Sequence, residues 1–211
     1  MDIVGDGTVG GIVSAAIDCV PSAQNANQAA ILLIYMGTSL VAQADHFTGV
    51  LAGVPNDPGL LSPNALFFVA AATTSVTITG SSFTNIANSY SPLITFEQGV
   101  NGVVYNCLFQ GNSGQLHGTV AVSSLMHVDV INSQFISNTC TCGGSFDAPC
   151  SDSSCHNAAI YVTEGASATV SGSNFANNVG HFGTALLVTS GASFDVSSST
   201  FTGNQHHAGD C

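Results

Sequence analysis

The stretch 104–112 reads VYNCLFQGN, and the stretch 130–138, one repeat later, reads VINSQFISN. Residues 170–178 (VSGSNFANN) and 196–204 (VSSSTFTGN) repeat the same pattern. The central phenylalanine also recurs in two earlier segments, and the full series is Phe47, Phe83, Phe109, Phe135, Phe175 and Phe201. The differences between successive numbers are 36, 26, 26, 40 and 26, so one value recurs three times. A fixed period of this length is typical of a solenoid, and the two larger steps indicate inserted loops.

Apolar residues alternate with other residues on the N-terminal side of each phenylalanine. Four columns, counted back from the phenylalanine, contain Ala42, Ile78, Val104, Val130, Val170 and Val196 (−5); Leu40, Val76, Gly102, Val128, Ala168 and Phe194 (−7); Ile34, Ala70, Phe96, Val122, Val162 and Val188 (−13); and Leu32, Phe68, Ile94, Val120, Ile160 and Leu186 (−15). This period of two predicts short strands with one face inward. Glycine at −10 in four of the six coils predicts the turn between two strands. Since no helical pattern lies between the strands, the sequence predicts a parallel β-helix.

The same frame predicts how the chain is organised. We expect an irregular N-terminal coil or cap in residues 1–30, the β-helix in residues 31–207, and a C-terminal tail in residues 208–211. The two long steps predict insertions near 48–66 and 140–157. Residues 1–20 lack the cationic start and unbroken apolar run of a signal peptide, so we interpret the chain as a mature or partial product.

An asparagine follows the phenylalanine at position +3 in the last four coils, at Asn112, Asn138, Asn178 and Asn204. Small residues then lead into the next strand, as in Gly118-Thr-Val-Ala-Val. Over roughly residues 31–207, these motifs resemble the F-x-x-N and G-G-A-[ILV] repeats of the polymorphic outer-membrane proteins, within the pectin-lyase-like class. The resemblance implies an all-β, right-handed parallel β-helix of about six to seven coils with a 26-residue period. Such repeats occur in adhesins, autotransporter passengers and uncharacterised surface proteins. We expect the stacked asparagines to form an amide ladder with a structural role.

The charge of the chain limits its partners. It has 12 acidic residues and neither lysine nor arginine, so its formal net charge is −12. Nucleic-acid binding requires cations that displace phosphate counterions, and anionic lipid surfaces attract basic segments. The sequence therefore predicts neither a nucleic-acid nor an anionic-membrane partner, and a fold held by apolar burial and hydrogen bonds.

Seven cysteines in a chain rich in serine and threonine favour an oxidising, extracellular compartment. Cys140, Cys142, Cys150 and Cys155 lie at the second insertion, where two disulfides would stabilise a loop that has no core of its own. Four cysteines allow three pairings, and the sequence leaves the choice open. A zinc site is the less favoured alternative, because the spacings match no familiar zinc finger.

The other three cysteines suggest a contact between subunits. Cys107 stands at −2, and Cys19 also falls at −2 if the frame extends one period before Phe47. Three coil steps would separate the two by about 14 Å, which is too far for a disulfide. Cys19 and Cys211 lie at opposite ends, which would allow a disulfide between successive subunits. A free or locally paired terminal thiol is the favoured alternative.

Residues suited to catalysis are sparse. β-Helix enzymes that resemble pectate lyases or polygalacturonases use basic residues together with carboxylates, and this chain has no lysine or arginine. Asp129 and Asp195 share column −6, but Thr169 lies between them, so two coil steps would place them about 10 Å apart. That spacing suits neither a carboxylate dyad nor a metal cage. We therefore expect no enzyme, no catalytic or metal-binding residue, and no cofactor.

Histidines offer one further metal candidate. His181 and His207 are separated by one period and would stack on adjacent turns, with His206 beside them. Stacked imidazoles can bind a transition metal, but solvated turn histidines are the more common case.

A stripe of apolar residues is predicted on the outer surface. Column −14 contains Leu33, Val69, Thr95, Ala121, Tyr161 and Leu187, and column −16 contains Ile31, Phe67, Leu93, Thr119, Ala159 and Ala185. An exposed apolar stripe marks contact with a partner, a neighbouring subunit or another part of the same chain. We take Leu33, Val69, Tyr161 and Leu187 as candidate interface residues, and cover by residues 48–66 as the alternative.

Together these features favour an extracellular or cell-surface structural or adhesive β-solenoid that self-associates end to end or laterally, with a filament subunit as one form. Because copies carry a net charge of −12, assembly should tighten with salt or calcium. Surface glycans are a further candidate partner, and a polysaccharide-binding or polysaccharide-degrading β-helix is the alternative function. The irregular −6 column argues against a third possibility, an ice-binding face.

Overall fold

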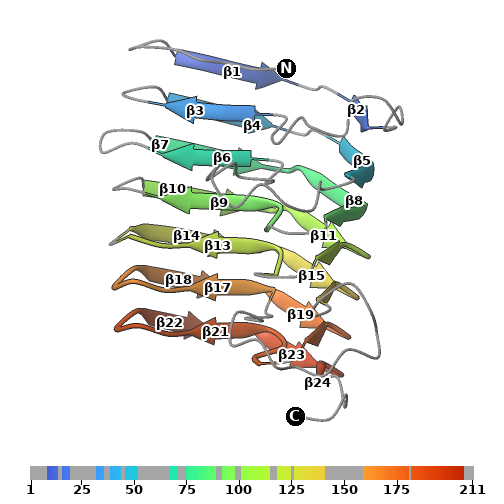
Figure 1. Ribbon diagram of the computed structural model, residues 1–211, viewed down its shortest axis with the longest axis vertical. Helices are drawn as coiled ribbons and strands as arrows, with labels where there is room; N and C mark the ends of the chain where they lie inside the picture. Colours follow the sequence, from blue (N-terminus) through green and yellow to red (C-terminus); the bar gives the residue numbers. More distant parts are fainter. Residues whose placement is uncertain are drawn as a thin grey trace, which may run out of the picture.

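The computed structural model is a stack of β-coils along one long axis (Figure 1). It describes residues 9–13, 16–19, 32–35, 39–43, 46–51, 67–70, 75–88, 92–97, 101–114, 118–124, 126–140, 159–180 and 182–206. Side chains are described within these ranges from residue 75 onward, except at 87, 88, 97, 114 and 140. Within these ranges every paired strand is parallel and no helix is present. The predicted all-β parallel solenoid with a period of about 26 residues is confirmed.

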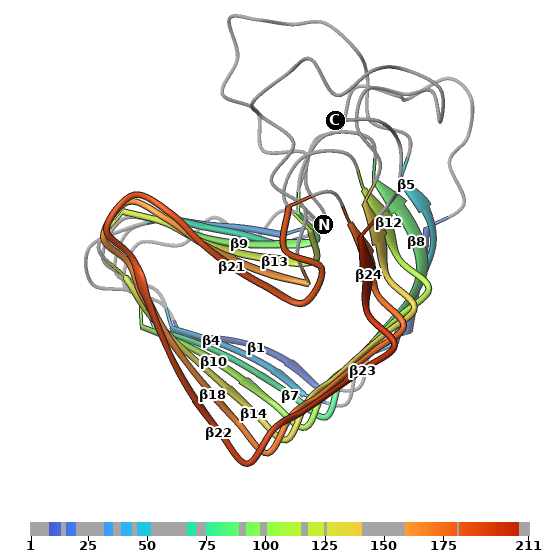
Figure 2. The same ribbon diagram turned by 90° about the horizontal axis from the view of Figure 1, so that it is seen from below.

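Each coil contributes a strand to three sheets, which form the sides of a tube (Figure 2). Sheet A contains β1 (Val9–Val13), β4 (Ser39–Gln43), β7 (Ser75–Thr79), β10 (Asn101–Tyr105), β14 (His127–Ile131), β18 (Ser167–Ser171) and β22 (Ser193–Ser197). Sheet C contains β3 (Leu32–Tyr35), β6 (Phe67–Ala70), β9 (Ile94–Glu97), β13 (Val120–Val122), β17 (Ile160–Val162) and β21 (Leu186–Val188).

Sheet B carries the phenylalanine series and has two strands in most coils. The first series is β2 (Ala16–Cys19), β5 (His46–Leu51), β8 (Ser82–Asn88), β11 (Leu108–Gln110), β15 (Gln134–Ile136), β19 (Asn174–Ala176) and β23 (Thr200–Thr202). The second is β12 (Ser113–Gly114), β16 (Thr139–Cys140), β20 (Val179–Gly180) and β24 (Gln205–His206). This second series starts where β12 pairs with the end of β8. About four turns are described in full, fewer than the six to seven predicted, although sheet A contains seven strands.

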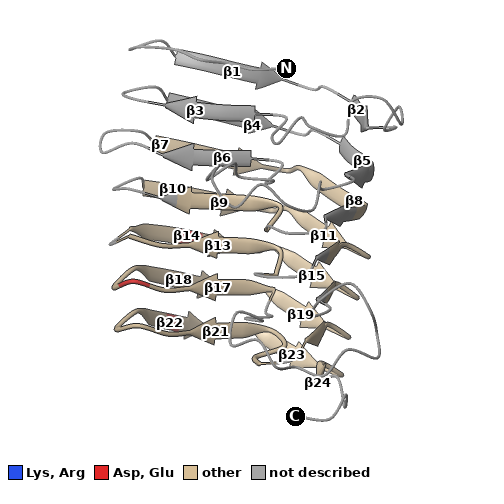
Figure 3. Cartoon of the chain, in the orientation of Figure 1, with Lys and Arg blue, Asp and Glu red and all other residues tan. Residues whose placement is uncertain are grey.

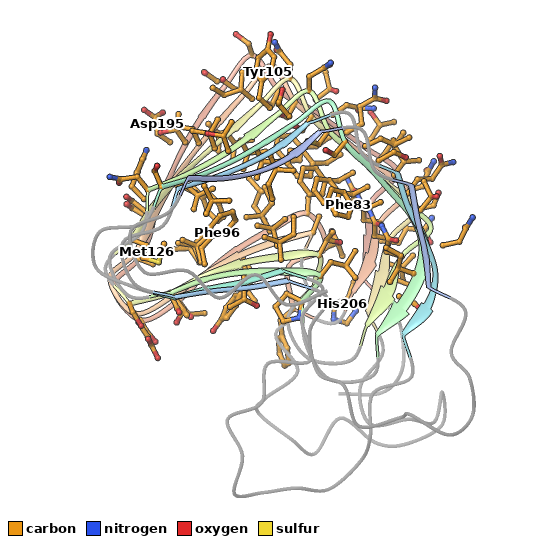
Figure 4. All side chains as sticks on the ribbon, turned by 90° about the horizontal axis from the view of Figure 1, so that it is seen from above. Phe83, Phe96, Tyr105, Met126, Asp195 and His206 are labelled. Atoms are coloured by element: carbon orange, nitrogen blue, oxygen red, sulfur yellow. The ribbon has the colours of Figure 1, made fainter. Side chains whose placement is uncertain are left out.

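The interior is made by the inward columns that the sequence predicts for sheets A and B. Ile78, Val104, Val130 and Val170 face each other in register across sheet A, and all four are fully buried. Phe83 and Phe96 point into this interior, whereas Tyr105 and Asp195 point away from it (Figure 4). Of the acidic residues whose side chains are described, Asp129 is partly exposed and Glu164 and Asp195 are exposed, with Glu164 at the turn between β17 and β18 (Figure 3). Apolar burial from consecutive coils forms one continuous core.

The chain turns its corners through left-handed backbone at fixed positions. Three residues before each phenylalanine the φ angle is positive, at Gly80, Asn106, Asn132, Gly172 and Ser198. Two residues after it the same holds, at Asn85, Gly111, Ser137, Asn177 and Gly203. Glycine and asparagine adopt this conformation at the lowest cost. The predicted −10 turn is also present, since Gly165 and Gly191 have φ of 72° and 75°.

The register of sheet C corrects the sequence frame in one coil. Val69 pairs with Phe96 and Ile34, and therefore occupies the inward column that was assigned to Ala70. Phe68 occupies the outward position that was assigned to Val69. The reason is local: four residues separate β6 from β7, whereas three separate β9 from β10. One extra residue in a turn moves every residue of the strand to the opposite face.

A second correction concerns the first coil. β1 pairs with β4 and β2 pairs with β5, so this coil adds strands to sheets A and B. Ile17 pairs with Phe47, which puts Cys19 opposite Gly49, two residues after the phenylalanine position. The predicted position of Cys19 at −2 is wrong, because the partner of Phe47 is Ile17 and not Pro21, where a regular period would put it. The expected tail, residues 208–211, lies outside the described residues.

Candidate functional site

The phenylalanine series forms a continuous stack inside the tube. The ring centroids of Phe83, Phe109, Phe135, Phe175 and Phe201 lie 4.7–4.9 Å apart, and neighbouring ring planes differ by 10° or less. This spacing equals the distance between paired strands, so the backbone ladder sets it. The stack is a structural element, since its inner members are fully buried.

The asparagines form an amide ladder beside the phenylalanines. Asn138 Nδ2 donates to the Phe109 carbonyl and to Asn178 Oδ1, both at 3.0 Å. Its Oδ1 accepts both the Asn112 N–H at 3.1 Å and Asn112 Nδ2–H at 3.0 Å. Asn112, Asn178 and Asn204 repeat parts of this pattern. Each side chain satisfies a backbone N–H and a carbonyl of the preceding coil, so these asparagines are positioned for structure rather than for a ligand.

A second polar ladder, which the sequence analysis missed, lies at the corner between sheets A and B. It occupies position −2 and consists of Ser81, Cys107, Ser133, Ser173 and Ser199. Ser133 Oγ accepts the Cys107 N–H at 3.1 Å and donates to the Ile131 carbonyl at 3.0 Å. The signal was available in the sequence, because serine recurs at −2 in four coils.

Cys107 replaces serine in this ladder. Its Sγ lies 3.4 Å from the carbonyls of Ile78 and Tyr105, and the residue is buried. Burial raises the pKa of the Cys107 thiol to about 11, although backbone groups, that of Ser81 foremost, act in the opposite direction. The thiol is therefore protonated at neutral pH and is unsuited to nucleophilic chemistry.

The outer face of sheet A holds a cluster that joins two coils. His127 Nδ1 lies 2.8 Å from Ser167 Oγ, and His127 Nε2 lies 3.0 Å from Asp129 Oδ1. Thr169 Oγ1 is 3.4 Å from the same Nε2 atom. The His127 and Asp129 side chains are 43% and 38% exposed. Sequence analysis missed this cluster, because polar residues on an outer face follow no periodic signal.

The cluster contains the residue types of a nucleophile–base–carboxylate triad, but its surroundings do not suit acyl transfer. Such chemistry needs donors that stabilise an oxyanion beside the nucleophile. The Ser167 N–H already donates to the Met126 carbonyl at 2.7 Å. Other backbone N–H groups along the coils are likewise paired with carbonyls of neighbouring coils. We interpret the cluster as polar contacts across an exposed sheet.

The two column aspartates stand apart, as expected, and two of the three candidate histidines fall outside the described residues. Asp129 and Asp195 both pair with Thr169, so they stand two strands apart in one column, as the sequence indicates. Across the described ranges, no group of three or more histidine, cysteine, aspartate or glutamate residues could hold a metal ion. His206 is exposed in β24, whereas the side chains of His181 and His207 lie outside the described residues. So do the side chains of Cys19, Cys140, Cys142, Cys150, Cys155 and Cys211.

The predicted outer stripe on sheet C is largely covered. Thr95, Ala121 and Tyr161 pair in one outward column, and all three are buried, with Tyr161 only 6% exposed. Tyr161 Oη lies 3.1 Å from Thr189 Oγ1. Leu187 is partly exposed, and Leu33 lies outside the described side chains. Because the chain is single, this burial is internal, which weakens the prediction of a lateral interface here.

The last coil exposes residues whose counterparts are buried in the inner coils with described side chains. Val188, Val196 and Phe201 are 45%, 42% and 46% exposed. Their counterparts one coil earlier, Val162, Val170 and Phe175, are fully buried. β21, β22 and β23 also lie at the edges of their sheets, and among the described residues no strand pairs with them on one side. This end surface is the described region best suited to bind another β-structure.

Comparison with known proteins adds no relative: no family model, curated protein or solved structure matches the chain. In the part of the chain that the structure describes, we find no helix of the length and apolarity needed to cross a membrane.

Proposed function

We propose that the protein is a structural or adhesive β-solenoid that self-associates through its open end. The observation that carries this proposal is the exposure of Val188, Val196 and Phe201 at a surface where three sheet edges end together. Apolar side chains next to unpaired backbone groups favour strand addition by another chain. The interior ladders support a structural role, since their asparagine and serine side chains form hydrogen bonds with backbone groups.

The setting we propose is extracellular or at the cell surface. Seven cysteines support an oxidising compartment, and the F-x-x-N motif with its amide ladder supports kinship with the repeats of polymorphic outer-membrane proteins. The protein acts in this proposal without a cofactor and without catalysis. A disulfide between Cys19 and Cys211 of successive subunits would fit end-to-end contact.

Self-association is tested by sedimentation velocity over a range of protein and salt concentrations. Raising the salt from about 0.01 M to about 1 M shortens the Debye length from about 30 Å to about 3 Å. Since each copy carries a net charge of −12, we expect larger and tighter assemblies at high salt. A folded monomer at all concentrations and salts would contradict the proposal.

A matched pair of variants separates the end surface from net charge. Val196→Asp puts a charge on the open end, where Val196 is partly exposed, and should abolish assembly. Ser197→Asp adds the same charge on the outer face of the same strand and should weaken assembly only slightly. Circular dichroism melts of both variants check that the coils remain folded.

Glycan binding is a second candidate, favoured by the exposure of Tyr105 on the outer side of sheet A. Ligand sites combine an aromatic surface with a few fixed polar groups. Asn101 begins the same strand and pairs with His127 of β14. Isothermal titration with soluble acidic and neutral polysaccharides tests this function, and heat that is unchanged in Tyr105→Ala would reject the site.

A further inference from the structure

We infer that the open end binds the opposite end of a second copy, so that β22 pairs in parallel with β1 of the next chain and sheet A continues without a break. This inference rests on the proposed self-association and names its partner surface, its polarity and its register. It predicts an open-ended filament rather than a closed dimer, because a head-to-tail contact along the coil axis leaves a free end at each step.

The two edges of sheet A are complementary because every strand in it is parallel. β1 and β22 lie at opposite edges, at the two ends of the stack (Figure 1). Each inner strand pairs with the preceding coil on one side and with the following coil on the other. β1 lacks a described preceding strand and β22 lacks a described following strand. All seven strands of sheet A are five residues long, so β1 and β22 match in length.

The backbone N–H and C=O groups that face outward at these two edges also lie at matching positions. Ser197 accepts a hydrogen bond from the Gly172 N–H of the preceding coil at 3.2 Å. Since alternate residues of a strand face opposite neighbours, the backbone groups of Phe194 and Val196 face the open side. By the same alternation, the backbone groups of Val9, Gly11 and Val13 face the open side of β1. The two sets interleave as donors and acceptors of one parallel ladder.

Register then aligns Phe194 with Gly10 and Val196 with Ile12, because Gly10 pairs with Leu40 in the column that contains Phe194. A glycine that makes room for a phenylalanine ring is present inside the chain, where the ring comes from the sheet C strand of the same coil. A Cβ built on Gly102 would lie 2.7 Å from the Phe96 ring, so the absence of a side chain there makes room for the ring. Gly10 would leave similar space for Phe194, which packs against the core and is partly buried.

Charge favours this contact over a two-fold one. A symmetric pairing of two β22 strands would be antiparallel, and full overlap of the five residues would put Asp195 directly opposite its own copy. Like charges directly opposite each other destabilise a strand pair. In the head-to-tail contact, Asp195 instead stands beside Gly11, which carries no charge.

Charge substitutions at Gly11 test the register with opposite expected signs. Gly11→Lys places a cation beside Asp195 of the neighbouring copy and should tighten assembly about two- to fivefold, whereas Gly11→Asp should weaken it by a similar factor. Thr77→Lys and Thr77→Asp are matched controls, since Thr77 lies in the same column two coils further in. Sedimentation at about 0.1 M salt measures the assembly of all four variants. The Debye length there is about 10 Å, so charges on neighbouring strands still interact.

A mixing experiment tests whether the contact between copies is head-to-tail. Gly11→Pro removes a donor from the open side of β1, and Val196→Pro removes one from the open side of β22. Each variant alone should be monomeric, and an equimolar mixture should form heterodimers and no longer species. Circular dichroism checks folding, and the Gly11 charge pair gives an answer even if a proline variant unfolds.

The outcomes separate the two proposals. If the wild-type chain assembles but every Gly11 variant behaves like the wild type, β1 is not the partner and the inference is overturned, while self-association stands. Dimers of Gly11→Pro that persist unchanged would instead establish a symmetric contact. A wild-type chain that stays monomeric overturns both.

Discussion

Two successive coils of this solenoid have nearly the same sequence pattern but different surroundings. The coil of β18, β19 and β20 buries Val170 and Phe175 completely, whereas the coil of β22, β23 and β24 exposes Val196 and Phe201 by 42% and 46%. The two pairs occupy the same columns and pair in register. The difference shows that burial in this fold depends on whether a further coil follows, and not on the coil's own residues. Stability is therefore a sum of contacts between nearest neighbours.

The largest difference between inner and last coils should appear when a stacked ring is removed. Phe135→Ala leaves a cavity between two fully buried rings and should lower the free energy of unfolding by about 3–5 kcal/mol. Phe201→Ala removes a ring stacked on one side and half exposed, so we expect a loss of about 1 kcal/mol. Urea unfolding at low protein concentration, where the chain is monomeric, measures both. Equal losses would contradict the view that neighbouring coils supply the burial.

The amide ladder should show the same contrast with a smaller effect. Asn138→Ala leaves two buried donors of Asn112 and the Phe109 carbonyl without partners, which should cost about 3 kcal/mol. Asn204→Ala removes matching bonds to Asn178 and Phe175, but water reaches this coil and can replace them, so about 1 kcal/mol is expected. Chemical unfolding of both variants tests the contrast, and a greater loss for Asn204→Ala would refute it.

Spacing alone was sufficient to predict most of the fold. The recurring period assigns Val104, Val130 and Val170 to one inward column, and the register confirms it. The period failed where an irregular turn intervened. The longer turn before β7 moved Phe68 and Val69 to the opposite faces from those predicted, and no residue in that turn signals the extra length.

The candidate site was less predictable than the fold, for a physical reason. Inward positions are constrained by packing, so their pattern repeats, whereas outward positions tolerate many residues and carry no period. His127 contacts Ser167 across the longest step of the series, which sequence spacing does not reveal without the register. Phe201 occupies the same column as the buried Phe175, so the column alone does not predict its exposure, which follows from its place in the last described coil.

The serine ladder predicts a pH dependence of stability that comes from one inner residue, Cys107. Burial raises the pKa of the Cys107 thiol from 9.0 to about 11, so the unfolded chain loses this proton first as the pH rises. Between pH 9 and pH 11 the unfolded state binds fewer protons than the folded state, and stability must therefore fall with rising pH. Cys107→Ser restores the residue found at −2 in the other coils and should remove this part of the decline.

Thermal unfolding of the wild type and Cys107→Ser at several pH values isolates the effect of the thiol. At neutral pH the two should differ by less than about 1 kcal/mol, because the serine hydroxyl can donate to the same carbonyls. Ser199→Ala in the last coil is the matched control, and its stability should follow the pH dependence of the wild type. Parallel declines for the wild type and Cys107→Ser above pH 9 would show that Cys107 does not cause them.

The corner glycines should give the smallest contrast, because alanine would meet the same backbone strain at both positions. Gly172 and Gly191 have φ of 59° and 75°, and alanine in that region costs about 1 kcal/mol. At Gly172 a Cβ would also meet Asn132 Oδ1 of the coil before it, whereas at Gly191 in the last coil it would meet nothing within 4 Å. We therefore expect Gly172→Ala to cost about 2 kcal/mol and Gly191→Ala about 1 kcal/mol. Asn132→Gly combined with Gly172→Ala should recover the difference, because it removes the atom that the new methyl group would strike and keeps a residue that tolerates the positive φ at position 132. If the double variant recovers nothing, the cost at Gly172 comes from the backbone alone, and the two coils differ in burial but not in the strain of their corners.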